Sequence, residues 1–331
     1  KLKKKLMIKD DFINPRNLKL WPNLGMRASF GLIALELAKL DEKLIILTGD
    51  VSTSAGLDRF RKNYPEKYID VGIAEQNLIG IAAGLSSEGY NVITTTFAPF
   101  QTTRCLEQIK VNLGYMNQKV CMVGLASGLV LGNLGYTHCC IEDIGVLRSI
   151  PNLDIVSPAD TTELARTLIE FYNSKNSMYI RLTGGSSIPL IFNNDYEFKL
   201  GKSKTLRKGD DVAIISTGSM LKTALDAAEI LSKSKITAEV INFSSIKPID
   251  KKKILEIGKK FNLTATIEEH NIIGGLGSAV AECLSSENSK TKQLFFGVDD
   301  KYTKGGEYQF LLDKFNLKAE KISKMIIKHL K

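Results

Sequence analysis

The sequence predicts an α/β protein made of two doubly wound domains. Short apolar runs of strand length alternate with longer segments whose apolar residues recur at helical spacing. The strand runs are continuously apolar, which is typical of parallel strands covered by helices on both faces. At 331 residues, 44% of them hydrophobic, the chain is longer than one ordinary domain and can bury two cores.

The first half of the chain begins with residues 1–20, which we interpret as an irregular N-terminal arm, and continues as a first domain at residues 21–190. Apolar residues at helical spacing predict a helix at 26–40. The strands that we expect after it are 44–48, 68–73, 91–96, 120–124, 154–157 and 178–182. The helices that we expect between them are 76–87, 102–111, 143–149 and 161–172.

A change of character between residues 184 and 209 marks the boundary between the domains. Glycine, proline, asparagine and charged residues replace the periodic pattern there, and we place the linker at 191–205. The second domain, residues 206–331, repeats the alternation. Its expected strands are 212–216, 238–241 and 263–267, and its expected helices are 221–231, 250–260, one beginning at 278 after a glycine-rich turn, and an amphipathic tail at 317–330.

The formal net charge of +9 comes from scattered lysines, and we interpret it as a solvated surface without a nucleic-acid partner. The most apolar stretch, residues 120–131, is interrupted by polar and small residues and is shorter than the roughly 20 residues that span a bilayer. Five cysteines without a CxxC pair do not form a disulfide framework. We therefore expect a cytoplasmic protein with no membrane role.

Four stretches bring chemically active side chains to the ends of expected strands or to a glycine-rich turn. They are 70–77 with Glu75, 96–100 with Phe97 and Phe100, 135–143 with His138, and 268–277 with Glu268-Glu269-His270 before Gly274-Gly275-Leu276-Gly277. Carboxyl ends of parallel strands are the usual ligand-binding edge of such sheets. Each stretch alone has a structural explanation: a helix-start carboxylate is usually a cap, phenylalanines are usually core, and a glycine-rich turn is weak evidence for phosphate binding.

Taken in order, these stretches resemble the C-terminal two-thirds of the transketolase family, over about residues 27–284. The matching motifs are Gly49-Asp50, Gly72-Ile73-Ala74-Glu75-Gln76-Asn77, Thr96-Phe97-Ala98-Pro99-Phe100, Gly135-Tyr136-Thr137-His138 and Ser157-Pro158-Ala159-Asp160. The resemblance implies a pyrimidine-binding domain for thiamine diphosphate, followed by a transketolase C-terminal domain.

The resemblance implies a role for each matching residue near the cofactor. Glu75 matches the glutamate that hydrogen-bonds the aminopyrimidine ring and activates the cofactor. Phe97 and Phe100 match the aromatic pair that holds this ring, and Asp50 belongs to the same cofactor-binding set. A third aromatic residue of the family is Thr103 here. His138 matches a histidine that faces the reacting carbons and bonds substrate oxygens or moves protons.

Half of the family's active site has no counterpart in this sequence. The family binds the diphosphate through Mg²⁺ with a Gly-Asp-Gly motif and a downstream asparagine, whereas Gly49-Asp50 and Gly209-Asp210 are not followed by glycine. We therefore expect the Mg²⁺ ligands on a partner, an N-terminal transketolase subunit. The resemblance implies a heterotetramer with two sites that transfers a two-carbon ketol unit from a ketose to an aldehyde.

The substrate end departs from the family pattern. Arg27 and Ser54 match a family arginine and serine near the sugar phosphate, and we assign them with His138 to substrate binding. The family's second arginine, a histidine and an aspartate fall on Gly184, Ala126 and Leu134. Losing charge-assisted bonds weakens binding by about 1.5–3 kcal/mol each. The substrate is therefore expected to be a small sugar outside the common phosphates, either nucleotide-linked or unphosphorylated.

Two alternatives remain open from the sequence. The chain resembles in domain order the beta subunit of 2-oxo acid dehydrogenases and other pyruvate-using thiamine diphosphate enzymes, such as 1-deoxyxylulose-5-phosphate synthase. It is also compatible with a non-catalytic scaffold subunit, although Glu75, Phe97, Phe100 and His138 are all present. Release of carbon dioxide distinguishes the first alternative, and replacement of Glu75 distinguishes the second.

Overall fold

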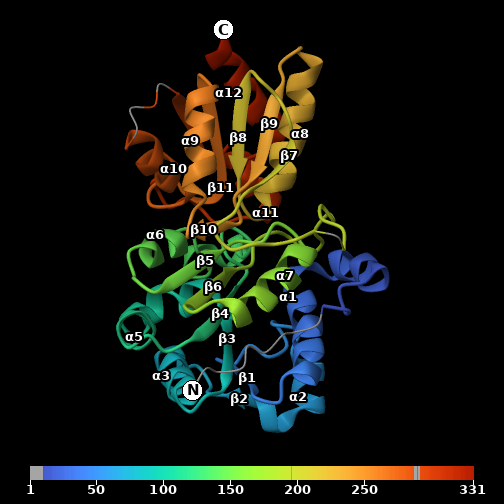
Figure 1. The fold of residues 1–331 in the computed structure, drawn as a ribbon, viewed down its shortest axis with the longest axis vertical. Helices are drawn as coiled ribbons and strands as arrows, with labels where there is room; N and C mark the ends of the chain where they lie inside the picture. Colours follow the sequence, from blue (N-terminus) through green and yellow to red (C-terminus); the bar gives the residue numbers. More distant parts are fainter. Residues whose placement is uncertain (1–9, 195, 287–288, 290) are drawn as a thin grey trace.

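A computed structural model describes residues 10–331 of the chain, apart from residues 195, 287, 288 and 290. Two α/β units are stacked along the long axis of the molecule, with the first unit in the lower half of Figure 1 and the second in the upper half. Each unit is a mainly parallel sheet with helices on both faces. The predicted fold class of two doubly wound α/β domains is thereby confirmed.

The first sheet has seven strands in the order β10-β5-β6-β4-β3-β1-β2. Neighbouring strands are parallel except for β10, which runs antiparallel to β5 at one edge. The parallel strands therefore all end at the same edge of the sheet. The strands are β1 (Leu44–Thr48), β2 (Tyr68–Asp70), β3 (Asn91–Phe97), β4 (Val120–Leu125), β5 (Leu153–Val156), β6 (Ser177–Arg181) and β10 (Ser245–Lys247).

Helices cover both faces of this sheet. α1 (Pro15–Leu40) and α7 (Thr161–Asn173) pack on one face, and α3 (Glu75–Ser87), the π-helix η3 (Ile109–Tyr115) and α6 (Asp143–Arg148) pack on the other. Shorter elements connect them and carry the site. They are α2 (Asp58–Asn63), η1 (Pro65–Lys67), α4 (Ala98–Gln101), η2 (Thr103–Cys105), α5 (Leu106–Gln108) and η4 (Gly132–Thr137).

The N-terminal arm expected at residues 1–20 is only partly irregular. Residues 1–9 lie outside the described residues, and α1 begins at Pro15, where the side chain of Asn14 accepts bonds from two backbone amides. Asparagine before proline is a strong helix start. Inside α1, Gly25 has a φ of +74° and interrupts the helix. Because of this break, the apolar residues before and after Gly25 do not share one helical period, and the sequence pattern predicted only the second part of the helix.

The helix expected at 102–111 is divided into short α, 3₁₀ and π segments. The hydroxyl of Thr102 donates to the carbonyl of Ala98 (2.7 Å), and the hydroxyl of Thr103 donates to that of Pro99 (2.8 Å). Threonine side chains that bond to the preceding turn compete with the regular helical ladder. The irregular segment that results carries Arg104, whose side chain pairs with Glu75.

The second sheet has five strands in the order β12-β11-β8-β9-β7, and only β7 is antiparallel to its neighbour. α8 and α12 pack on one face, while α9 and α10 pack on the other. The strands are β7 (Lys204–Arg207), β8 (Val212–Ser216), β9 (Ala238–Asn242), β11 (Leu263–Asn271) and β12 (Lys292–Val298). The helices are α8 (Met220–Lys233), α9 (Lys251–Lys260), α10 (Leu276–Ser285), α11 (Tyr308–Lys314) and α12 (Ala319–Leu330).

The connection between the units is packed rather than loose. Residues 182–203 form no regular helix or strand where they are described, and the expected linker at 191–205 ends inside β7. The backbone amides of Ile191 and Phe192 donate to the carboxylate of Asp160 at the start of α7. One strand of the second unit, β10, also extends the first sheet, so the two units share their boundary.

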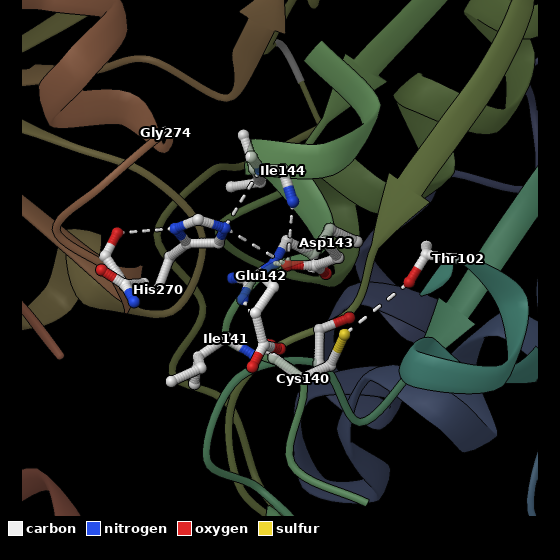
Figure 2. Close-up of polar contacts among 12 residues, drawn as sticks. Thr102, Cys140, Ile141, Glu142, Asp143, Ile144, His270 and Gly274 are labelled. Atoms are coloured by element: carbon white, nitrogen blue, oxygen red, sulfur yellow. Dashed lines mark hydrogen bonds and ion pairs between the residues drawn. The ribbon is translucent and has the colours of Figure 1, made fainter. Parts of the chain in front are cut away.

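A buried ion pair lies at this boundary. Arg181 at the end of β6 is 1% exposed and donates through Nε to both carboxylate oxygens of Asp143 (2.8 and 2.9 Å). It also donates to the carbonyl of Glu269 in the second unit (2.7 Å). Figure 2 shows the ring of His270 from β11 beside Asp143, where its Nε2 accepts from the amide of Gly145 (3.2 Å). These contacts fix the two units relative to each other.

No helix in the described part of the chain combines the length and apolar character needed to cross a bilayer.

Candidate active site

The carboxylate of Glu75 lies at the start of α3, just beyond the end of β2, and its side chain is only 3% exposed. Nη1 of Arg104 is 2.9 Å from its Oε1, and this is the polar partner that the described residues offer it. A Cβ atom added at Gly49 would lie 3.2 Å from Cγ of Glu75. The glycine after β1 therefore lets the backbone approach the carboxylate closely.

Three rings gather next to this carboxylate. Phe97 ends β3, Phe100 lies on α4, and His138 follows η4, about 40 residues further along the chain. The centroid of the His138 ring is 5.3 Å from that of Phe100 and 6.2 Å from that of Phe97. The guanidinium carbon of Arg104 lies 3.9 Å from the centroid of Phe100, which joins the rings to Glu75 through one side chain.

The orientation of His138 is set by its neighbour. The Oγ1 atom of Thr137 is 3.0 Å from Nδ1 of His138 and 3.3 Å from the carbonyl oxygen of Leu134. When the hydroxyl donates to this carbonyl, its oxygen accepts from Nδ1–H, which leaves Nε2 as a free acceptor. His138 is thereby suited to accept a proton or a hydrogen bond from a bound molecule.

Asp50 lies apart from the ring cluster. Its backbone has a φ of +57°, and its amide donates to Oδ1 of Asp70 (3.0 Å). Its side chain is exposed, and no described contact joins it to Glu75 or to the rings. The structure thus brings Glu75, Phe97, Phe100 and His138 together and leaves Asp50 at the margin.

A cavity of about 600 Å³ opens at the same edge of the first sheet, and Arg27 and Ser54 both line it. Ala126 after β4 and Gly184 after β6 line it too, whereas Leu134 is 57% exposed and lies outside its lining. Among the described residues that line this cavity, Arg27 carries the one charged side chain, and no ion pair with a described residue engages it. We refer to this space as the Arg27 cavity.

The backbone conformation at Gly184 disfavours any residue with a side chain at that position. Its φ is +92°, in the region that favours glycine. A Cβ atom there would lie 2.2 Å from Cδ1 of Ile188. This part of the lining of the Arg27 cavity therefore requires a glycine, and an arginine could replace it only with a local rearrangement.

The backbone amides of the glycine-rich turn after β11 already bind a carboxylate of the same chain. Both carboxylate oxygens of Glu268 accept bonds of 2.7 Å from the amides of Leu276 and Gly277 at the start of α10. A Cβ atom at Gly275 would lie 2.0 Å from Oε2 of the same carboxylate. The helix start is thus capped from within the chain and is not available for a phosphate.

Two residues near the site were missed in the sequence. Arg104 follows Phe100 by four residues, a spacing that places side chains on one helical face and could have indicated the contact. Tyr308 comes from the second unit and lines the Arg27 cavity. No local signal could have found Tyr308, because more than 280 residues separate it from Arg27 along the chain.

The residues that carry this site match two family models. Residues 23–186 match the transketolase pyrimidine binding domain, and residues 201–322 match the transketolase C-terminal domain. The chain is 37% identical over 312 residues to a putative transketolase C-terminal section of Methanocaldococcus jannaschii, covering 93% of this chain and 96% of that one. It is 36% identical over 297 residues to the 6-deoxy-6-sulfo-D-fructose transketolase subunit SqwH of a Clostridium species, covering 90% of this chain and 92% of that subunit.

A solved structure agrees with these matches. A split-gene transketolase described as an inactive beta4 tetramer superimposes with a TM-score of 0.82 at 34% identity, covering 93% of this chain and 98% of that one. The order of domains, the extent of the matches and the fold lead to one conclusion: the chain belongs to the transketolase family.

Proposed function

We propose that this chain is the C-terminal subunit of a two-subunit, thiamine diphosphate-dependent transketolase of the cytoplasm. The observation that carries the proposal is the buried carboxylate of Glu75 beside the cluster of Phe97, Phe100 and His138. A flat heteroaromatic ring with a basic nitrogen fits this combination of aromatic faces and a carboxylate. The five cysteines are all free, which agrees with a reducing compartment.

Each of the four residues at the site has a defined role in the proposed reaction. Thiamine diphosphate, when bound, supplies the carbon centre that stabilises the transferred ketol unit. Glu75 holds a proton at the pyrimidine ring nitrogen, and the low dielectric of its buried position strengthens that bond. Phe97 and Phe100 orient the ring and exclude water. His138 bonds a substrate oxygen or moves a proton through Nε2.

The proposal places the diphosphate and Mg²⁺ on a partner. Among the described residues, no group of three or more His, Cys, Asp or Glu side chains is arranged to hold a metal ion. Two relatives are described as a transketolase C-terminal section and a transketolase subunit, and the similar split-gene transketolase structure is an inactive beta4 tetramer. We therefore propose a heterotetramer in which the N-terminal subunit supplies the missing half.

The Arg27 cavity supports a substrate outside the common sugar phosphates. Its described lining has one charged side chain, and Ala126 and Gly184 stand where the family carries a histidine and an arginine. We infer that the sugar is unphosphorylated or nucleotide-linked. The name of the related SqwH subunit, which belongs to a 6-deoxy-6-sulfo-D-fructose transketolase, supports a ketose other than the common sugar phosphates.

The test is to coexpress this chain with a chain that carries Gly-Asp-Gly and the downstream asparagine. The purified complex is assayed with thiamine diphosphate and Mg²⁺ for ketol transfer from fructose, fructose 6-phosphate and 6-deoxy-6-sulfofructose. Transfer without carbon dioxide supports the proposal. Carbon dioxide release from pyruvate would instead indicate a 2-oxo acid enzyme, and transfer to ribose 5-phosphate with ordinary affinity would remove the inferred substrate preference.

A further inference from the structure

A segment of the second unit, residues 302–308, lies against the loop that carries His138. The rings of Tyr136 and Tyr302 are 4.9 Å apart, and the hydroxyl of Tyr136 is 3.2 Å from that of Thr303. The amide of Gly306 donates to the carbonyl of Gly132 (2.9 Å). A Cβ atom at Gly132 would lie 2.4 Å from the carbonyl oxygen of Gly306, so this approach requires glycine.

The segment ends at Tyr308, which is part of the wall of the Arg27 cavity. Its ring carbons lie 3.8 and 3.9 Å from the position of a Cβ atom at Gly185, which also lines the cavity. The remaining residues that line the cavity all come from the first unit. Tyr308 is therefore the point at which the second unit enters the substrate end of the site.

The hydroxyl of Tyr308 is already engaged. It donates to Oε2 of Glu269 at 2.7 Å, and Ser219 donates to the same oxygen at 3.1 Å. Burial raises the pKa of Glu269, and these donors act against that rise. With its polar atom held by Glu269, the phenol ring presents an apolar face to the cavity rather than a hydrogen-bond donor.

Glu269 also holds a second part of the cavity lining. Its Oε1 accepts from the amide of Leu129 (2.7 Å), and Leu129 is followed directly by Val130 and Leu131, which line the cavity. A Cβ atom at Gly128 would lie 2.4 Å from this oxygen. One carboxylate, 1% exposed, therefore sets the distance between the Tyr308 ring and the 130–131 wall.

We propose that Tyr308 is a specificity-determining residue, which limits the length and shape of the sugar that the Arg27 cavity accepts. This inference rests on the proposed transketolase function and deepens it. The substrate class that fits is a ketose whose tail presents a C–H face to the ring, with any anionic group directed to Arg27. The second unit is then a part of the substrate site and not only a packing partner.

The experiment uses the assembled two-subunit enzyme with variants Tyr308→Ala, Tyr308→Phe and Phe310→Ala. Phe310 lies two residues away on α11 and is 55% exposed, which makes it a matched control. The kcat/KM values for fructose and for sedoheptulose, an unphosphorylated ketose that is one carbon longer, give a ratio for each variant. We expect Tyr308→Ala to change this ratio on the order of 10-fold, because a methylene in a pocket discriminates by about that factor or more.

The phenylalanine variant keeps the ring but loses the bond to Glu269 that positions it, so we expect its ratio to change less than that of Tyr308→Ala. The ratio of Phe310→Ala should stay near that of the wild type. An unchanged ratio in Tyr308→Ala, with transfer otherwise normal, would overturn the inference and leave the proposed function standing. Complete absence of transfer by the wild-type complex would instead count against the proposed function.

A second measurement needs neither a variant nor turnover. Hydrogen–deuterium exchange of the peptide that covers residues 302–308 is compared in the assembled complex with and without saturating 6-deoxy-6-sulfofructose. The inference requires slower exchange in this peptide with the ketose. Equal exchange, while peptides around Arg27 become protected, would overturn it.

Discussion

The proposed cofactor end, around Glu75, and the proposed substrate end, the Arg27 cavity, occupy the same edge of the first sheet, but they are built differently. At the cofactor end, side chains fill the space: Glu75 pairs with Arg104, and Arg104 covers the ring of Phe100. At the substrate end, a cavity of about 600 Å³ is lined largely by backbone, small and apolar residues, with Arg27 as the charged member of its described lining.

This difference indicates that the cofactor and the substrate place different demands on the residues of the site. A cofactor of one shape needs a carboxylate and aromatic faces at set positions, whatever sugar is used. Substrate contacts can change with the sugar, because they contribute binding energy rather than the reaction itself. This agrees with the resemblance, which implies that the family residues are retained at Glu75, Phe97, Phe100 and His138 and replaced at Ala126, Leu134 and Gly184.

The strongest test of the cofactor end is Glu75→Gln, which keeps the size of the side chain and removes its charge and proton chemistry. We expect transfer by the assembled enzyme to fall by about 10³-fold, within the range typical of acid–base groups. Steady-state kinetics at saturating cofactor measures the change. Glu107→Gln is the control, since this exposed glutamate on α5 pairs only loosely with Lys110 (3.7 Å). Equal activity of both variants would support a scaffold role and contradict the proposed role of Glu75 in activating the cofactor.

The corresponding test of the substrate end is Arg27→Met. Charge-assisted bonds contribute about 1.5–3 kcal/mol, so KM for a donor with an anionic group should rise by roughly 10–100-fold while kcat changes little. An uncharged ketose should be unaffected. Arg61→Met, which removes an exposed arginine paired with Asp58, is the control. A fall in kcat without a rise in KM would place Arg27 with the reacting atoms instead.

The backbone of the substrate end is tested by Gly184→Ala. A residue with a Cβ atom costs about 1–2 kcal/mol in the left-handed region, and contact with Ile188 adds to this cost. We expect a lower free energy of unfolding in denaturant titrations. Gly80→Ala on α3 should be neutral or stabilising, because nothing lies within 4 Å of a Cβ atom there. No loss of stability in Gly184→Ala would contradict the inferred strain at this position.

The smallest effect is expected for Arg104→Met, measured as thermal stability of the cofactor-free chain. The variant leaves the buried carboxylate of Glu75 without its cation, but Arg104 is 41% exposed, and solvent screens part of the loss. We expect a destabilisation of about 1 kcal/mol, compared with nearly none for Arg61→Met. Identical melting curves would show that the pair does not organise the cofactor end.

Some features of this protein could be read from short stretches of sequence. Apolar strand runs and helical periodicity predicted most of the elements, because burial imposes those periods locally. Glu75, Phe97 and Phe100 follow strands directly, so their position at the ligand-binding edge follows from the topology of parallel sheets. The helical start at Pro15 was missed, although Asn14 carried its signal, because Pro22 and Gly25 interrupt the pattern behind it.

Other features depend on segments that are distant in the chain. The addition of β10 to the first sheet and the position of Tyr308 in the Arg27 cavity both join the two units. The triplet Glu268-Glu269-His270 could be noticed in the sequence, but its three side chains have separate partners: a helix start, a tyrosine and a backbone amide. Such pairings are decided when whole sheets and helices pack, and no local period encodes them.

The sequence by itself thus predicted the two doubly wound domains and indicated the residues of the proposed cofactor end, because both depend on local patterns and on motifs next to strand ends. Only the tertiary structure decided that Arg104 holds Glu75, that Gly184 excludes a side chain, and that Tyr308 of the second unit lines the Arg27 cavity. The physical reason is that burial and close contact are set by the packing of distant segments, not by their neighbours in the chain.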